Sequence, residues 1–218
     1  MARDFVAGAE NVNYGDNLEP TNMSCMAWVR VDTAAAFNVA LAKNYTTTSS
    51  SPYISYGVGL RATSQYSCYV AVGTTLYPAE SAVIAVAGDK KFIGGTYDGE
   101  TVTVFINGGT ATNTSPSGNL AYSTGLLKIA NNANDSNDWV GPIGECAIWS
   151  ADIGSTKMQA LERGVNPFVM RDDIQLFYQP VWGNDSPEVD YTGRLSGTVS
   201  GGTKANWHPP VEHMENYL

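Results

Sequence analysis

FIGGTYDGETVTVFINGG, residues 92–109, is the most regular stretch of this chain, and its pattern is that of two β-strands joined by a turn. The turn is expected at Asp98-Gly99, because Asp before Gly favours the positive backbone angles of a two-residue hairpin turn. Residues 102–106 then alternate in polarity, which is typical of a strand with one buried face. The second strand is expected to end at the sequence NGG, residues 107–109. The stretch predicts an antiparallel hairpin, and neither of its strands carries a nucleophile, a base or a metal-binding cluster.

Similar short alternating segments lie on both sides of this hairpin. In NMSCMAWVRVD, one predicted face consists of Met23, Cys25, Ala27, Val29 and Val31, and the other of Met26, Trp28 and Arg30. Further strands are expected at 4–14, near 38–44 and 53–61, and in QYSCYVAVG and SAVIAVAG. Short strands separated by Gly or Pro turns at even spacing predict an all-β fold, in which two antiparallel sheets pack as a sandwich.

One segment, residues 156–163, has the pattern of a short helix. Thr156 and Gln159 have the spacing of a capping box, and Gly164 is a typical residue for the end of a helix. The expected buried side of this helix consists of Met158 and Leu161. A single helix of about two turns is therefore predicted in an otherwise β chain.

The chain changes character after residue 169, where Pro and Gly become frequent and no period holds for long. Residues 1–169 are predicted to form the folded domain, and residues 170–218 an extended C-terminal arm. The arm is too rich in apolar residues for a free linker. Its predicted assembly contacts are Phe177, Tyr178, Trp182, Trp207 and Tyr217. The sequence leaves two alternatives open, since these side chains could pack on a neighbouring molecule or fold back over their own sandwich.

The composition excludes several classes of partner. The 218 residues carry a net charge of −9 without a basic stripe, so no nucleic acid is expected to bind. No apolar window approaches the length of a membrane span, and no signal peptide is recognisable at the N-terminus. Synthesis and folding in a cytosol are therefore expected. The three cysteines, Cys25, Cys68 and Cys146, lie far apart in predicted strands and are expected to be buried free thiols.

Several motifs in order give the chain a resemblance to a known family. AGAENVNYGD, MAWVRVD, GGTYDGETVTVFINGG and LLKIANNANDSNDWVGPIGECAIWSADIGSTKMQALERGVNP together resemble the laminin-G-like, concanavalin A-like jelly roll domains over residues 4–168. The resemblance implies a jelly roll sandwich. One departure is Ala130, where this family usually has Gly. The tail, with FYQPVWG, PEVDYTG and WHPPV, resembles C-terminal extensions of such domains in bacteriophage proteins.

The catalytic pattern of the glucanases in that superfamily is not recognisable here. In those enzymes one strand presents carboxylates two and three residues apart (E-x-D-x-x-E or E-x-D-x-E), which aims an acid and a nucleophile at one groove. The nearest match in this chain is Glu188-Val189-Asp190, which lacks the third carboxylate and lies in the arm. The two histidines, His208 and His213, also lie in the arm. No catalytic residue is predicted, and the chain is not expected to be an enzyme.

The best candidate for a binding loop is NNANDSNDW, residues 131–139. Its candidate ligand-binding residues are Asn131, Asn132, Asn134, Asp135, Asp138 and Trp139. Asn134, Asp135 and Asp138 offer the oxygen ligands that calcium prefers, and the resemblance implies calcium at a loop rim. The alternative is that Asn and Asp only form a turn. Trp139 could likewise stack on a sugar ring or pack in the core.

Three functions are compatible with these patterns. The first is a structural or decoration component of a virion, bound to other virion proteins or to copies of itself. The second is a lectin-like module that binds a cell-surface glycan and acts outside the cell. The third, a glycoside hydrolase, is disfavoured because the paired carboxylates are lacking. The virion function explains best why a lectin-like jelly roll has no recognisable secretion signal and keeps unpaired thiols.

Overall fold

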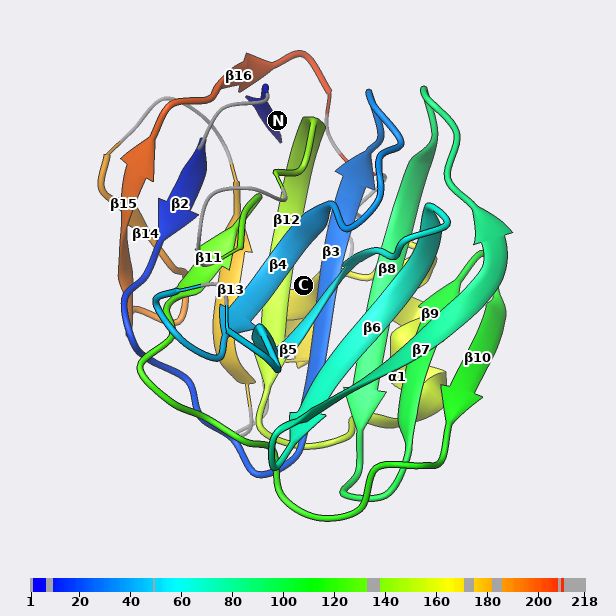
Figure 1. Cartoon of the computed structure of the whole chain (residues 1–218). Helices are drawn as coiled ribbons and strands as arrows, with labels where there is room; N and C mark the ends of the chain where they lie inside the picture. The colour runs from blue at the N-terminus through cyan, green and yellow to red at the C-terminus, as the bar shows by residue number, and fades with distance from the viewer. Residues whose placement is uncertain are drawn as a thin grey trace.

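The alternation in NMSCMAWVRVD produces β3 (Met23–Arg30), which lies between β8 (Lys90–Tyr97) and β12 (Gly141–Trp149) in one sheet. The computed structural model describes residues 2–6, 10–48, 50–132, 138–170, 175–181, 186–207 and 209. Over these residues the chain forms two sheets stacked face to face, and every pairing between their strands is antiparallel (Figure 1). The predicted all-β sandwich is confirmed.

Each sheet contains eight strands. The first has the order β10-β9-β8-β3-β12-β1-β16, and β13 also pairs with β12. Its other strands are β1 (Ala2–Phe5), β9 (Val102–Ile106), β10 (Gly109–Asn113), β13 (Gln175–Pro180) and β16 (Thr203–Ala205). The second sheet has the order β14-β15-β2-β11-β4-β5-β6-β7. Its strands are β2 (Asn11–Asn13), β4 (Val39–Asn44), β5 (Ile54–Leu60), β6 (Gln65–Val72), β7 (Thr75–Ile84), β11 (Leu127–Ile129), β14 (Glu188–Val189) and β15 (Ser196–Ser200).

The main core lies between the two sheets. The predicted inner face of β3 is confirmed, since Met23, Cys25, Ala27 and Val29 are fully buried in it. All three cysteines are free and buried, as predicted. Burial raises the pKa of the Cys68 and Cys146 thiols well above the ordinary value, so both stay protonated and unreactive near neutral pH.

The hairpin between β8 and β9 forms, but its turn differs from the prediction. Tyr97 is paired with Val102, so residues 98–101 make a four-residue loop. The Asp98 side chain accepts hydrogen bonds from the backbone N–H groups two and three residues later, at 2.9 and 2.7 Å. The predicted two-residue turn at Asp98-Gly99 is therefore wrong, because the Asp98 carboxylate stabilises a wider loop.

The two-residue turn lies at the next connection, between β9 and β10. Ile106 is paired with Gly109, and the two residues between them, Asn107 and Gly108, have φ angles of 53° and 72°. Positive φ at both central residues is the geometry of a type I′ turn, for which Asn-Gly is the preferred sequence. The short loop extends the hairpin into a three-stranded meander at one edge of the first sheet.

The single α-helix of the described residues is α1 (Gly154–Glu162), which begins two residues before its predicted start. The predicted capping box is wrong, since Ile153 occupies the N-cap and no side chain there caps the helix. Instead the Gly154 N–H donates to the Asp152 carboxylate at 2.7 Å. The predicted end is confirmed, because Gly164 has a φ of 97° and donates its N–H to the carbonyl of Leu161 at 3.0 Å. A short 3₁₀ helix, η1 (Pro167–Met170), follows.

Helix α1 covers the outer face of the first sheet, on the far side of the sandwich in Figure 1. Met158 and Leu161, the predicted buried residues, are fully buried there. They belong to a second apolar cluster that includes Met26 and Trp28 from the outward face of β3. The first sheet is therefore apolar on both faces, which explains why β3 reads as nearly continuous hydrophobic sequence.

The two ends of the chain complete the sandwich together. Residues 4–14, predicted as one strand, form the separate strands β1 and β2 in different sheets. Strand β16 pairs with β1 in the first sheet, and β15 pairs with β2 in the second. Strand β13 pairs with β12, in line with β1 along the same edge. Residues 175–205 thus contribute strands to both sheets, while a domain boundary at residue 170 stays a prediction.

The aromatic residues of the segment predicted as an arm pack inside their own chain. Phe177 is fully buried, and its ring meets that of Tyr14 edge-on at a centroid distance of 4.9 Å. Tyr178 and Trp207 are buried in the outer apolar cluster, which also includes Met158 and Leu161 of α1. The prediction that Phe177, Tyr178 and Trp207 contact a neighbouring molecule is wrong, since these side chains lie in the interior. The other two predicted contacts, Trp182 and Tyr217, lie outside the described residues.

A buried ion pair joins the first strand to this late segment. The Arg3 guanidinium donates to Glu188 Oε1 from Nε at 3.0 Å and from Nη2 at 2.5 Å. Gln179 Nε2 donates to the other oxygen of Glu188 at 3.0 Å. Arg3 and Glu188 are only 1% and 5% exposed. A charge pair at this depth requires both partners, because either charge left alone would be poorly solvated.

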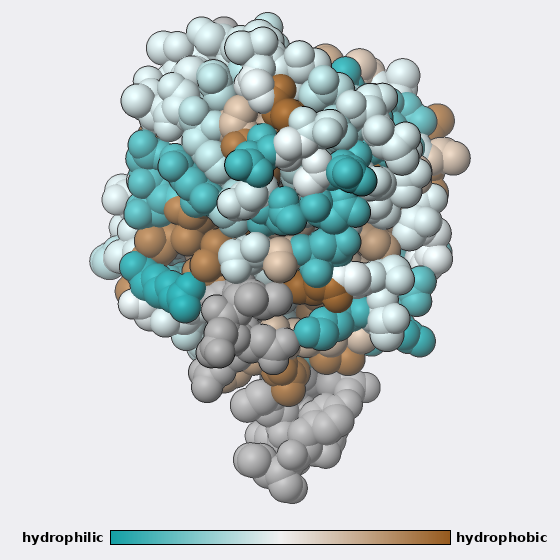
Figure 2. Space-filling model, turned by 90° about the horizontal axis from the view of Figure 1, so that it is seen from below, coloured by the Kyte–Doolittle hydropathy of each residue, from teal (hydrophilic) through white to brown (hydrophobic). Residues whose placement is uncertain are grey.

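One end of the sandwich, seen from below in Figure 2, has hydrophobic side chains in small separate areas among hydrophilic ones. Individually exposed apolar residues of this kind are normal for a folded protein. No helix in the described parts of the chain is long and apolar enough to cross a membrane.

Candidate functional site

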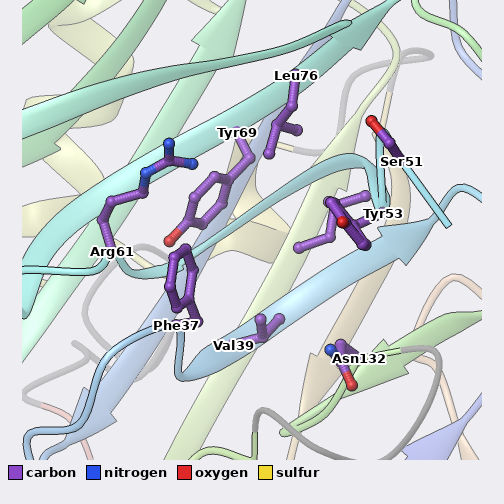
Figure 3. A pocket seen from close by; sticks show the side chains of 9 residues that line it. Phe37, Val39, Ser51, Tyr53, Arg61, Tyr69, Leu76 and Asn132 are labelled. Atoms are coloured by element: carbon purple, nitrogen blue, oxygen red, sulfur yellow. The ribbon is translucent and has the colours of Figure 1, made fainter. Parts of the chain in front are cut away.

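A groove of about 480 Å³ lies on the outer face of the second sheet, opposite the face of the sandwich that α1 covers. The loop before β4, the loop between β4 and β5, and the segment after β11 bring their residues together over β4 to β7. The residues that line the groove are Phe37, Val39, Ser51, Tyr53, Ile54, Arg61, Tyr69, Leu76 and Asn132 (Figure 3).

The floor of the groove is apolar. Val39, Ile54 and Tyr69 are buried and form a small cluster on this face, with Leu76 packed against it. The Tyr69 hydroxyl donates a hydrogen bond to the carbonyl of Leu60. Burial raises the pKa of Tyr69 above its ordinary value, so the phenol stays neutral and keeps this bond. The floor is thus a packed hydrophobic surface in which the one hydroxyl, that of Tyr69, is hydrogen-bonded.

Two exposed aromatic side chains stand above this floor. Phe37 is 41% exposed and Tyr53 is 48% exposed, although both are large apolar groups. Their φ angles are 63° and 68°, in the left-handed region that bulky residues rarely adopt. Such conformations cost on the order of 1–3 kcal/mol and concentrate at functional sites. Tyr53 is fixed by its N–H bond to the carbonyl of Ser50, at 2.8 Å, and by the N–H of Tyr45, which donates to the Tyr53 carbonyl at 2.9 Å.

Arg61 is the one charged residue among the described residues that line the groove. Its guanidinium carbon lies 5.7 Å from the centre of the Phe37 ring, which is within the range of a cation–π contact. Its Nε lies 3.1 Å from Glu80 Oε1 in an ion pair. In Figure 3, Arg61, Phe37 and Tyr69 lie together, and Tyr53 and Ser51 lie on the other side of the groove.

The predicted binding loop, residues 131–139, reaches the groove with Asn132 alone among its described members. Asn131 is fully buried, and its side-chain oxygen accepts the N–H of Asn132 at 2.6 Å. Asp138 forms an isolated parallel bridge with Val39 at the start of β4. Asn134 and Asp135 lie outside the described residues, so calcium at this loop stays a prediction. The described residues contain no group of three or more His, Cys, Asp or Glu that could hold a metal ion.

Trp139 packs in the core rather than at a binding surface. It is 1% exposed, and its indole N–H donates to the carbonyl of Arg30 at 3.1 Å. Of the two roles that the sequence left open, packing is the one observed, and the prediction that Trp139 binds a ligand is wrong. The physical reason is that the Trp139 side chain lies in the main core between the two sheets, where a large apolar group is buried.

The carboxylates nearest to a glucanase pattern have structural roles. Glu188 is held in the ion pair with Arg3. Asp190 is 1% exposed, and its two oxygens accept backbone N–H groups of Thr192, Arg194 and Leu195 at 2.6–3.0 Å. A carboxylate that satisfies several backbone donors stabilises a turn and is not available to a substrate.

The groove residues Phe37, Tyr53, Arg61 and Tyr69 were not recognisable as a site from the sequence. The one available signal is an aromatic residue in a polar or small-residue context, in AAAFNV and SSPYIS, where alternation does not require an apolar side chain. That signal marks exposure but does not show that the two segments meet, because the contact depends on how β4 and β5 pair.

Comparison with solved structures shows the same fold in carbohydrate-related proteins. A putative carbohydrate-binding protein from Bacteroides ovatus superposes with a TM-score of 0.70 at 14% identity, over 97% of this chain and 61% of its own. The CBM40 of the Ruminococcus gnavus IT-sialidase, bound to α2,3-sialyllactose, has a TM-score of 0.56 at 11% identity, over 74% of this chain and 98% of its own. Domain 4 of AbnA, a GH43 extracellular arabinanase from Geobacillus stearothermophilus in complex with arabinotriose, has a TM-score of 0.55 at 14% identity, over 72% of this chain and 75% of its own.

At these identities the similarity establishes the fold alone. The chain spans less than two thirds of the Bacteroides ovatus protein. No curated protein sequence matches the chain significantly. A family model does match it, over residues 7–156, which is more than half of its 218 residues. This match and the observed sandwich show that the chain belongs to the concanavalin A-like lectin/glucanases superfamily.

Proposed function

We propose that this protein is a non-catalytic carbohydrate-binding module that holds a sugar in the groove over β4 to β7. The observation that carries the proposal is the pair of exposed aromatic side chains, Phe37 and Tyr53, fixed above an apolar floor by strained backbone. A protein gains nothing in stability by exposing two rings at positive φ, so the arrangement is best explained by a ligand.

The chemistry of the groove suits a sugar ring. The apolar C–H face of a pyranose stacks on an aromatic side chain, and its hydroxyls need polar partners at the rim. Ser51, Asn132 and Arg61 supply such partners around the rings of Phe37 and Tyr53. The volume of about 480 Å³ is within the range of small-molecule sites, so one or two sugar units would fit.

The solved structures of similar fold support this function. The Ruminococcus gnavus module is bound to sialyllactose and the Geobacillus stearothermophilus domain to arabinotriose. Binding rather than hydrolysis is proposed because hydrolysis needs two carboxylates that flank the bond. The described lining of the groove includes no Asp or Glu, and the nearby Glu80 is paired with Arg61.

A glycan array followed by calorimetry tests the proposal. Tyr53→Ala and Phe37→Ala should each weaken the binding of an array hit by about tenfold or more, as expected for the loss of one stacking ring. Tyr191→Ala is the matched control, since Tyr191 is 51% exposed but does not line the groove. Binding that survives both groove substitutions, or that the control removes, would contradict this location.

The setting of the module is a separate proposal. We propose that it is a component of a virion and that the groove is presented on a particle, with other virion proteins or copies of the chain as partners. The support is the resemblance of its tail to bacteriophage extensions, together with three buried cysteines that remain free. Stoichiometric copurification with a particle supports this setting, and secretion as a free protein supports an extracellular lectin.

A further inference from the structure

The guanidinium of Arg61 has two terminal nitrogens to which no other described residue is hydrogen-bonded. Its Nε is occupied by Glu80 at 3.1 Å, and its plane is held near the ring of Phe37. Neither terminal nitrogen has a hydrogen-bond partner among the residues that the structure describes, and the side chain is only 28% exposed. Within the described residues, Arg61 is therefore held at Nε by Glu80 and on one face by the Phe37 ring, and its two terminal NH₂ groups are unpaired at the groove.

This arrangement is suited to a planar anion. A guanidinium places two parallel N–H groups at the spacing of the two oxygens of a carboxylate, and such bidentate contacts are among the stronger hydrogen bonds in proteins. A guanidinium already held by a ring and an ion pair also loses little conformational freedom when it binds. Glu80 fixes the orientation of the guanidinium through Nε and does not contact its two terminal nitrogens.

We propose that the groove selects a sugar that carries a carboxylate, and that Arg61 is the residue that recognises this group. The inference rests on the proposed carbohydrate-binding function and adds the class of ligand. The sugar ring would stack at Phe37 or Tyr53 while its carboxylate receives two hydrogen bonds from Arg61. Since the chain has a net charge of −9, an acidic ligand needs a specific local cation to bind at all.

The test uses matched pairs of ligands and the full chain. Calorimetry compares α2,3-sialyllactose with lactose, a glucuronic-acid-terminated disaccharide with its glucose-terminated counterpart, and sulfated lactose with lactose. The expected result is that the carboxylated member of a pair binds about tenfold or more tightly than the neutral one, as a charge-assisted contact implies. Added salt should weaken the binding of the acidic ligand and leave the affinity for the neutral ligand unchanged.

Three variants locate the effect. Arg61→Gln should reduce affinity for the acidic sugar by about 10- to 100-fold and change affinity for the neutral one by less than about threefold. Arg61→Lys keeps the charge but not the fork and should recover only part of the preference. Arg163→Gln is the matched control, because Arg163 is exposed beyond the end of α1, on the opposite face of the sandwich.

Each outcome decides between the two proposals. Equal binding of acidic and neutral sugars, still sensitive to Tyr53→Ala, overturns the acidic preference and keeps the carbohydrate module. A preference for sulfated lactose over both carboxylated sugars also overturns it. In that case the bidentate contact between the guanidinium and a planar carboxylate does not determine the selectivity. An acidic preference that survives Arg61→Gln assigns recognition to another residue and overturns the role of Arg61. No binding by any ligand of the panel overturns both proposals.

Discussion

Removing the charge of Glu188 should destabilise this protein by several kcal/mol, because its carboxylate pairs with a buried guanidinium. Glu188→Gln preserves the size of the side chain but leaves Arg3 charged, 1% exposed and without the Glu188 carboxylate. The pair also connects the N-terminal strand β1 to the late strand β14, so the loss weakens the contact between the two ends of the chain.

The magnitude follows from the burial and the number of hydrogen bonds. Glu188 accepts two hydrogen bonds from Arg3, at 3.0 and 2.5 Å, and one from Gln179 at 3.0 Å. Breaking a buried pair typically costs about 3–5 kcal/mol, because the remaining charge is not solvated. The glutamine oxygen can still accept one bond from Arg3, so the lower end, about 3 kcal/mol, is expected.

Urea unfolding followed by tryptophan fluorescence measures this difference. Asp32→Asn provides the control, since Asp32 pairs with Arg30 at 2.7 Å but the two side chains are 34% and 31% exposed. That exposed pair should contribute at most about 1 kcal/mol. The double variant Arg3→Met, Glu188→Met replaces both charges by apolar groups and should be more stable than Glu188→Gln. A loss below about 1 kcal/mol in Glu188→Gln, or a double variant less stable than it, would refute the reasoning.

Three further predictions concern pH, the late strands and calcium. Burial raises the pKa of Glu145 to about 7, so the stability due to its neutral form is complete below its ordinary value of 4.5 and is lost as the pH rises through 7. Glu145→Gln should remove this loss, making the variant more stable than the parent at pH 8 by about 2–3 kcal/mol in urea unfolding. If the free energy of unfolding depends on pH in the same way in the parent and the variant, this prediction is wrong. Truncation after Met170 removes the four strands β13 to β16 and should give a product without cooperative unfolding in circular dichroism, while a well-folded monomer would show that residues 1–170 fold independently. If the 131–138 loop holds structural calcium, millimolar calcium should raise the Tm and Asp138→Ala should abolish the rise, and no shift would favour a simple turn.

Local patterns in the sequence were enough to predict the architecture. Successive side chains of a strand point to opposite sides, so the alternation in β3 places one set of its side chains in the main core and the other set in the outer cluster. The buried side of α1 and its end at Gly164 follow from helical spacing and from the freedom of glycine at positive φ. These features depend on residues within a few positions of one another, so they can be recognised without knowing the fold.

Local capping and turn details were less predictable, because alternative local bonds compete. Asp98 was expected in a two-residue turn, but its carboxylate accepts two backbone N–H groups and stabilises a four-residue loop. Thr156 was expected to cap the helix, but Asp152 binds the N–H of Gly154 and the helix begins earlier. In both places an Asp side chain accepts backbone N–H groups, and these local bonds compete with the predicted turn or cap.

Only the tertiary structure decided where the late segment and the candidate site lie. The pairing of β15 with β2 and of β16 with β1 joins residues from opposite ends of the chain, and no local pattern specifies a partner at that separation. The groove likewise requires Phe37, Tyr53 and Arg61 to meet over strands whose register is set by the whole sheet. Sequence therefore determined which residues form strands, turns and core, because those choices are local. The tertiary structure determined which surface became a groove, because that depends on long-range packing.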